Sequence, residues 1–104
     1  MTTLCHLNDL EEGKSLGFAS HLGPVFAVKR DGIVYVYQNE CPHLHVNLEH
    51  QTDQFLDDEG ALIQCSVHGA LFEIETGACL SGPCQGDSLT PVKYQIRQGN
   101  ICLP

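Results

Sequence analysis

Four residues of the types that bind soft metal ions stand in two short motifs of this chain. The 104 residues include six Cys and six His. Cys41 and His43 form a Cys-x-His motif, and Cys65 and His68 form a Cys-x-x-His motif. Each motif offers one thiolate and one imidazole, so two facing loops would supply two sulfur and two nitrogen ligands. This donor set suits a zinc ion or an iron–sulfur centre.

The details of the spacing favour an iron–sulfur centre over zinc. The single residue between Cys41 and His43 is a tighter spacer than the two to four residues usual in zinc fingers. Gly69 follows His68 directly, and a Gly82-Pro83 pair stands further along the chain. Glycines let the backbone approach inorganic sulfide closely, so that N–H groups can point at it.

The elements around the motifs are expected to be strands. The chain has 10 Gly and 5 Pro, with short apolar runs between them, which is typical of an all-β domain. Residues 25–30 and 33–38 are rich in β-branched and aromatic side chains, and Asp31-Gly32 between them predicts a two-residue hairpin turn. A second hairpin is expected from strands at 92–97 and 101–103, turned by residues 98–100. Shorter strands are expected at 4–7, 17–22, 62–64 and 71–74, with a turn at 75–77 and one helical turn at 47–50.

Together the two motifs resemble the signature of the Rieske family. Residues 41–44 and 65–69 carry it, and residues 71–77, 80–83 and 91–93 also resemble the family. The similarity extends from about residue 39 to residue 103. It implies an all-β, Rieske-like fold, with an antiparallel β-sandwich or barrel scaffold. Residues 1–104 would form a single domain, into which a loop-rich cluster-binding subdomain of about residues 40–85 is inserted.

The resemblance also implies the cofactor and its ligands. One 2Fe-2S cluster per chain would have one iron bound by Cys41 and Cys65 and the other by His43 and His68. The Gly82-Pro83 pair corresponds to a loop that covers the cluster from a third side.

The function implied is one-electron transfer. The chain resembles the ferredoxin component of ring-hydroxylating dioxygenases, which would carry electrons from a flavoprotein reductase to a terminal oxygenase or another reductase. This is an electron-transfer component of an oxidoreductase system rather than a stand-alone enzyme. The alternatives are a small electron-transfer or regulatory subunit of a larger oxidoreductase, similar to the small subunit of nitrite reductase, a redox or iron sensor, and a zinc-bound structural module.

Departures from the high-potential members of the family predict a low reduction potential. Those relatives carry an additional Cys in each cluster loop, where this chain has Val46 and Val67, so the disulfide between the loops cannot form. They also carry a Ser and a Tyr that donate hydrogen bonds to the cluster sulfurs, where this chain has Ala70 and Phe72. Hydrogen bonds to sulfur stabilise the reduced cluster, so their loss lowers the potential.

The remaining Cys and His residues are expected to be structural. Cys79 and Cys84 could form a disulfide or hold a second metal, but buried thiols are the commoner outcome. His45 stands where the family commonly has a small residue, and we expect an exposed loop residue there rather than a ligand. We expect Cys5 and His6 to be strand residues that bind no metal. Cys102 is expected to be a small core residue, and His21 and His50 are expected at the surface.

The acidic composition restricts the partners. The chain has 13 acidic and 5 basic side chains and a formal charge of -8, which argues against nucleic acid and against an anionic membrane surface. The acidic residues Asp53, Asp57, Asp58 and Glu59 are expected to form a solvated loop, with a docking face for a basic partner as the alternative.

No apolar stretch approaches the roughly 20 residues of a membrane-spanning helix. Because the N-terminus lacks the features of a secretion signal, we expect a cytoplasmic protein, monomeric by default.

Overall fold

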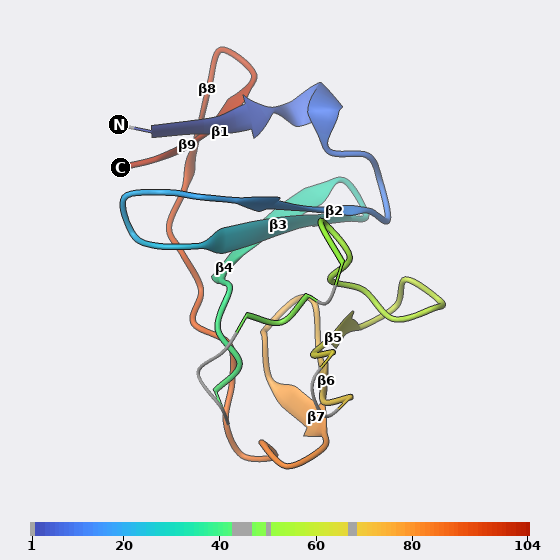
Figure 1. The fold of residues 1–104 in the computed structure, drawn as a ribbon. Helices are drawn as coiled ribbons and strands as arrows, with labels where there is room; N and C mark the ends of the chain where they lie inside the picture. The colour runs from blue at the N-terminus through green and yellow to red at the C-terminus, as the bar shows by residue number, and fades with distance from the viewer. Residues whose placement is uncertain (1, 43–46, 50, 67–68) are drawn as a thin grey trace.

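A computed structural model describes residues 2–42, 47–49, 51–66 and 69–104. Within these residues the strands form three antiparallel sheets of three strands each, which lie one below another in Figure 1. The only helical element of the described part is a 3-10 turn, η1 (Leu7–Asp9). The expected all-β, antiparallel fold class is therefore confirmed. No described helix has the length and apolar character needed to span a membrane.

The middle sheet contains the longest strands and has the order β2-β3-β4. β3 (Val25–Arg30) and β4 (Ile33–Gln38) have the predicted bounds. The turn between them has positive φ at Asp31 (54°) and Gly32 (78°), as a two-residue hairpin with the twist of its strands requires. β2 (Ser15–Phe18) begins and ends earlier than expected, because residues 20–23 form a turn in which the Ser20 hydroxyl donates to the carbonyl of Gly23.

The upper sheet of Figure 1 has the order β1-β9-β8 and brings the two ends of the chain together. It consists of β1 (Thr2–His6), β8 (Gln95–Arg97) and β9 (Asn100–Leu103). The predicted second hairpin is present, but its first strand is shorter than the expected 92–97. The reason is that Val92 donates its N–H to the carbonyl of Val36 in β4, so this stretch pairs with the middle sheet before it reaches β9.

The lower sheet has the order β5-β6-β7 and very short strands, namely β5 (Ile63–Gln64), β6 (Leu71–Phe72) and β7 (Cys79–Ser81). The sequence did not predict β7. The expected turn at 75–77 is present, and Gly77 has a φ of 77°. The predicted helical turn at 47–50 is wrong for residues 47–49, because the Leu48 N–H donates to the side chain of Asn39, and His50 lies outside the described residues.

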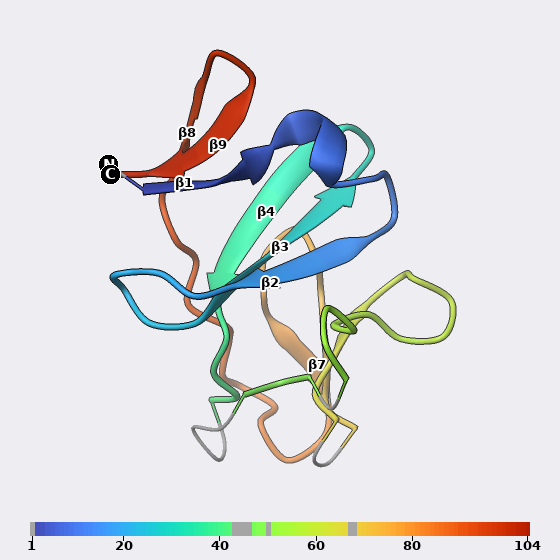
Figure 2. The same cartoon turned by 45° about the horizontal axis from the view of Figure 1, so that its top comes forward.

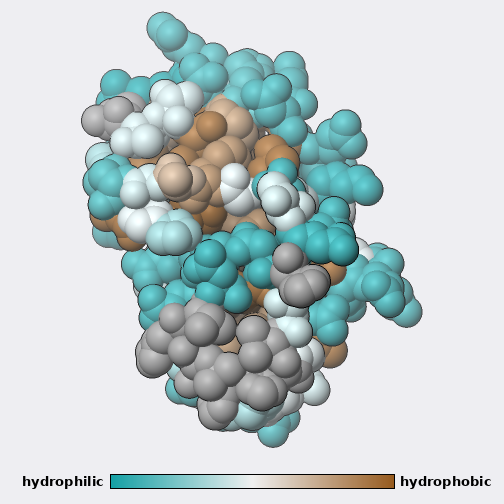
Figure 3. Space-filling view, in the orientation of Figure 1, coloured by the Kyte–Doolittle hydropathy of each residue, from teal (hydrophilic) through white to brown (hydrophobic). Residues whose placement is uncertain are grey.

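Two groups of buried side chains fill the space between the sheets. The upper core lies between the upper and middle sheets, and the lower core lies between the middle sheet and the lower loops (Figure 2). In Figure 3, brown apolar side chains show at the level of the upper core, and a band of polar side chains crosses the middle of this face. The upper core is built from Leu10, Val25, Ala27, Val34, Val36, Val92, Ile101 and Leu103. The lower core includes Phe26, Leu48, Phe55, Ile63, Ala70, Phe72, Ile74 and Leu89, together with four cysteines, Cys41, Cys65, Cys79 and Cys84.

Candidate metal centre

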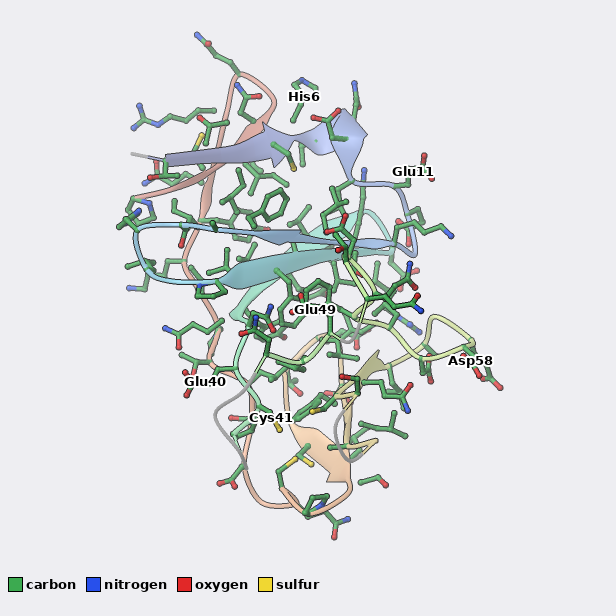
Figure 4. All side chains as sticks on the ribbon, in the orientation of Figure 1. His6, Glu11, Glu40, Cys41, Glu49 and Asp58 are labelled. Carbon is green, nitrogen blue, oxygen red and sulfur yellow. The ribbon has the colours of Figure 1, made fainter. Side chains whose placement is uncertain are left out.

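The two cysteines of the motifs lie in the same core. Cys41 is 2% exposed and Cys65 is fully buried, and both belong to the lower core. Cys41 follows the end of β4, where Figure 4 shows it below the middle sheet and beside the lower strands. Cys65 follows β5 directly. The fold therefore brings two soft sulfur donors from distant parts of the sequence into one apolar environment.

The second motif begins a tightly closed loop. The Cys65 N–H donates to the carbonyl of Ala70 over 2.8 Å, and the Gly69 N–H donates back to the carbonyl of Cys65 over 2.9 Å. Gly69 has a φ of 68°, in the left-handed region that favours glycine. The Ser66 N–H donates to the carbonyl of Leu48 over 2.8 Å and so ties this loop to the chain that follows the first motif.

Asn39 positions the first motif, and sequence reasoning gave it no role. Its side chain is 6% exposed, accepts a hydrogen bond from the Leu48 N–H at 2.8 Å, and donates to both carboxylate oxygens of Glu49 at 2.9 Å. The chain before Cys41 is thereby joined to the chain after the first motif. The available signal was an amide side chain two residues before Cys41, but nothing local in the sequence identifies Glu49 as its partner.

The loop of Gly82 and Pro83 packs on the loop of the second motif. A methyl group added at Gly82 would lie 2.9 Å from Cα of Ala70, and Gly82 has a φ of 106°. Only glycine therefore fits at this position without a shift of the Ala70 backbone. This contact packs residue 82 against residue 70, and the role of the loop in covering the cluster stays a prediction.

Cys79 and Cys84 flank that loop and lie against each other. Their Sγ atoms are 2.7 Å apart. Burial raises the pKa of the Cys84 thiol to about 12, helped by its hydrogen bond with Cys79 and by the negative charges that Cys79 and Cys41 would carry as thiolates. The expectation that both residues are buried is confirmed.

Several predicted residues cannot be placed. His43, His45, Val46, His50, Val67 and His68 lie outside the described residues. The ligand roles of His43 and His68 and the exposed position of His45 therefore stay predictions, whereas Val46 and Val67 carry no sulfur and cannot form a disulfide. In the described part of the chain, no group of three or more His, Cys, Asp or Glu side chains could hold a metal ion.

The remaining Cys and His predictions can be compared with the structure. His6 is exposed, and its Nδ1 accepts a hydrogen bond from the Asn8 N–H, which caps η1. His21 is exposed, as expected, and its Nδ1 lies 3.0 Å from the hydroxyl of Thr2. Cys102 is 4% exposed and confirms the prediction of a core residue. Cys5 packs against the upper core.

The acidic residues after the first motif divide into two kinds. Asp53 accepts a hydrogen bond from the Gly17 N–H at 2.7 Å, and Asp57 accepts from the Ala61 and Leu62 N–H groups. Asp58 and Glu59 are exposed. Two of the four carboxylates therefore stabilise the backbone, and the solvated-loop interpretation holds only for the other two.

The donor chemistry of the described residues fits an iron–sulfur cluster. The setting is compact and apolar and suits a cluster held by sulfur. It contains two buried thiols, two loops joined by a hydrogen bond from Ser66, and a third loop that packs closely through Gly82. A match to a known protein family decides the type of iron–sulfur cluster: the Rieske [2Fe-2S] domain matches residues 1–96. The chain belongs to the Rieske family. The expected cofactor, one [2Fe-2S] cluster, is confirmed at the level of the family.

Individual relatives agree with this assignment. This Rieske chain is 31% identical over 90 residues to the ferredoxin component of naphthalene 1,2-dioxygenase/salicylate 5-hydroxylase systems from Ralstonia sp, covering 86% of this chain and 82% of the relative. It is 33% identical over 105 residues to apoptosis-inducing factor 3 from Mus musculus, covering 97% of this chain. It spans only 16% of the length of that mouse protein.

A solved structure confirms the Rieske ferredoxin fold. The Sphingomonas yanoikuyae B1 ferredoxin matches with a TM-score of 0.76 and 27% sequence identity, covering 97% of this chain and 94% of that chain. The similarity covers nearly the whole of both chains, so it includes all three antiparallel sheets of this chain.

Proposed function

We propose that this Rieske protein is a low-potential one-electron carrier, which passes electrons from a flavoprotein reductase to a terminal oxygenase or another reductase. The observation that carries this proposal is the burial of Cys41 and Cys65 in one core of a Rieske chain. A [2Fe-2S] cluster supplies reversible one-electron chemistry when it is bound. The ferredoxin component from Ralstonia sp, which this chain resembles over most of its length, supports the role of a carrier between partners.

The proposed ligands are Cys41 and Cys65 for one iron and His43 and His68 for the other. Burial keeps the two sulfur donors away from water and from solvent thiols. The hydrogen bonds of Cys65 to Ala70 and of Ser66 to Leu48 hold the second loop in place.

The low potential is proposed from two positions next to the second motif. Ala70 and Phe72 are buried and carry no hydroxyl, so neither can donate a side-chain hydrogen bond to a cluster sulfur. Fewer such hydrogen bonds favour the oxidised cluster. Potentiometry should therefore give a value well below that of Rieske proteins that carry Ser and Tyr at these positions, and an equally high value would contradict the proposal.

The proposal also covers the domain organisation, the oligomeric state and the location of the chain. We propose that residues 1–104 act as one monomeric, cytoplasmic domain, whose cluster-binding part is about residues 40–85. The acidic composition supports partners that are proteins rather than nucleic acid or membrane. Size-exclusion chromatography with light scattering tests the monomer, and fractionation of cells that express the tagged chain tests the location.

A second candidate role is that of an electron-transfer unit within a larger protein or assembly. The resemblance to apoptosis-inducing factor 3, of which the chain spans 16%, favours this alternative, because there the matching region is part of a much longer chain. Co-purification from the native cell discriminates the two roles. A carrier is recovered alone, whereas a subunit is recovered with a constant partner.

The decisive experiment uses protein purified without oxygen. We expect two iron and two acid-labile sulfide per chain, as the [2Fe-2S] formula requires, and a reduced-state paramagnetic resonance spectrum with the low average g of mixed Cys and His ligation. Cys65→Ser and His68→Ala should each abolish or transform this spectrum, whereas Cys102→Ser, a matched change of a buried cysteine in the upper sheet, should leave it intact. Rapid reduction by a flavoprotein reductase, followed by oxidation by a terminal oxygenase, tests the carrier role. If no reductase of the native organism reduces the protein, the sensor alternative is favoured.

A further inference from the structure

Cys79 and Cys84 form a pair of thiols that the proposed metal centre does not use. Their Sγ atoms lie 2.7 Å apart, and the side chains are 9% and 1% exposed. A disulfide bond joins two sulfurs at about 2.05 Å, so the two sulfurs already lie close to bonding distance. Neither residue belongs to the two ligand motifs.

The backbone holds the two cysteines face to face. The Cys79 N–H donates to the carbonyl of Asp87 over 3.0 Å, and the Asp87 N–H donates to the carbonyl of Cys84 over 2.9 Å. Asp87 therefore connects the backbones of both cysteines. Cys79 is also fixed in β7, where it pairs with Phe72 of β6. The close approach of the sulfurs is thus supported by hydrogen bonds at both ends.

The segment between the cysteines is accessible from solvent on one side. Leu80 is 46% exposed, and residues 81–83 are exposed as well. Cys79 is the less buried of the two residues, so we expect a small reagent to reach it first. On its inner side the same segment rests on Ala70 through Gly82.

We propose that Cys79 and Cys84 are a dithiol–disulfide couple, a second redox site in this chain that is oxidised by small-molecule disulfides. Cys79 loses its proton and its sulfur attacks one sulfur of the reagent, which breaks the reagent's S–S bond and releases one thiol. Cys84 then loses its proton and its sulfur attacks Cys79, which forms the protein disulfide and releases the second thiol. The dithiol is oxidised by two electrons, the reagent is reduced by two electrons, and the two protons leave on the two released thiols.

The bond would close a ring around the exposed segment 80–83. Because Gly82 rests on Ala70, the ring would hold this segment against the loop of the second motif. The site differs from the proposed centre in its chemistry, since it exchanges two electrons and two protons through sulfur alone.

The test treats cluster-loaded protein, without oxygen, with 2-hydroxyethyl disulfide as the probe. After an acid quench and denaturation, free thiols are alkylated and the chain is analysed by mass spectrometry and peptide mapping. We expect a single internal cross-link between Cys79 and Cys84, two fewer alkylated thiols, and loss of the cross-link on treatment with dithiothreitol. The visible spectrum of the cluster should persist throughout.

Variants make the outcome specific. Cys79→Ser and Cys84→Ser should each abolish the cross-link, and Cys102→Ser should retain it. Stable mixed adducts on single cysteines, a cross-link that includes Cys41, or oxidation only after loss of the cluster would each overturn the proposal. Because the bond is read by mass and the cluster by its spectrum, failure of the electron-carrier proposal would be recognised separately.

Discussion

The hairpin of β3 and β4 and the loops around Cys41 and Cys65 are held together by different kinds of interaction. Six residue pairs align the two strands from Val25 to Arg30 and from Gln38 to Ile33. β5 and β6, beside the second motif, share only two aligned pairs. The loop around Cys41 is instead closed by the side chain of Asn39, and the hydrogen bond from Ser66 to Leu48 joins it to the loop around Cys65.

The two regions therefore differ in how far they depend on individual side chains. A ladder of backbone hydrogen bonds does not depend on the side chains that point to solvent, although the buried side chains of β3 and β4 still pack in the two cores. The loops depend on individual side chains and on glycines at set positions. Outside the two apolar cores, single substitutions should therefore cost more in the loops than in the hairpin, and the predictions below test this in order of decreasing effect.

A pair of glycine substitutions gives the most direct comparison. Gly32 in the β3–β4 turn has a φ of 78° with open space around it, whereas Gly82 has a φ of 106° and lies against the Ala70 backbone. Gly32→Ala should cost about 1–2 kcal/mol through backbone strain alone. Gly82→Ala adds overpacking to the strain and should cost about 2–4 kcal/mol.

The measurement is the free energy of unfolding in urea, together with the iron content of the purified protein. We expect Gly82→Ala to lower both quantities and Gly32→Ala to lower only the first. Equal losses of stability with full iron content in both variants would mean that the contact between Gly82 and Ala70 has no importance for the centre.

The second prediction concerns the side chain that joins the two ends of the first loop. Asn39→Ala leaves the Leu48 N–H without its acceptor and Glu49 without its donor, which should cost about 1–3 kcal/mol. The amide of Leu48 should also exchange its hydrogen faster, which nuclear magnetic resonance or mass spectrometry can follow. Asn8→Ala, at an exposed position in η1, is the matched control and should change stability by less than about 0.5 kcal/mol. If the two substitutions had the same effect, the loop would not depend on Asn39.

The sequence predicted best those elements whose signals are local. β3 and β4 have the expected bounds, because two β-branched runs enclose an Asp-Gly turn. β7 could not be predicted, since Cys79–Ser81 carries no alternating pattern and becomes a strand only by pairing with Leu71 and Phe72. In the same way, Val92 left the predicted strand because of a partner, Val36, that is far away in the sequence.

In the candidate site, too, local features were predicted from the sequence and contacts between distant residues were not. Residue type and spacing pointed to Cys41 and Cys65, and both are buried in one core. Spacing could not reveal the side chains that support them. The pairing of Asn39 with Glu49 and the contact of Gly82 with Ala70 depend on how distant loops meet in space.

The smallest expected effect is a pH dependence of the connection between the two regions. Tyr37 belongs to β4, and its hydroxyl donates to the carbonyl of Ile74 beside the lower sheet at 2.6 Å. Burial raises the pKa of Tyr37 to about 12, and the negative charges of Tyr35, Glu75 and Glu73 act in the same direction. Folding therefore favours the protonated phenol, whose ordinary pKa is about 10.

The sign of the pH effect follows from this shift. Below about pH 10 the phenol is protonated in both the folded and the unfolded chain, so its contribution to the free energy of unfolding is complete. This contribution is lost as the pH rises toward 12, because the unfolded chain releases the proton first. Tyr37→Phe removes the hydrogen bond and should cost about 1 kcal/mol near pH 8. The difference in unfolding free energy between the natural chain and this variant should then shrink between pH 10 and pH 12, as measured by urea titration followed with circular dichroism. A constant difference over that range would show that Tyr37 does not titrate differently in the two states, and the link between the hairpin and the lower loops would then rest on packing.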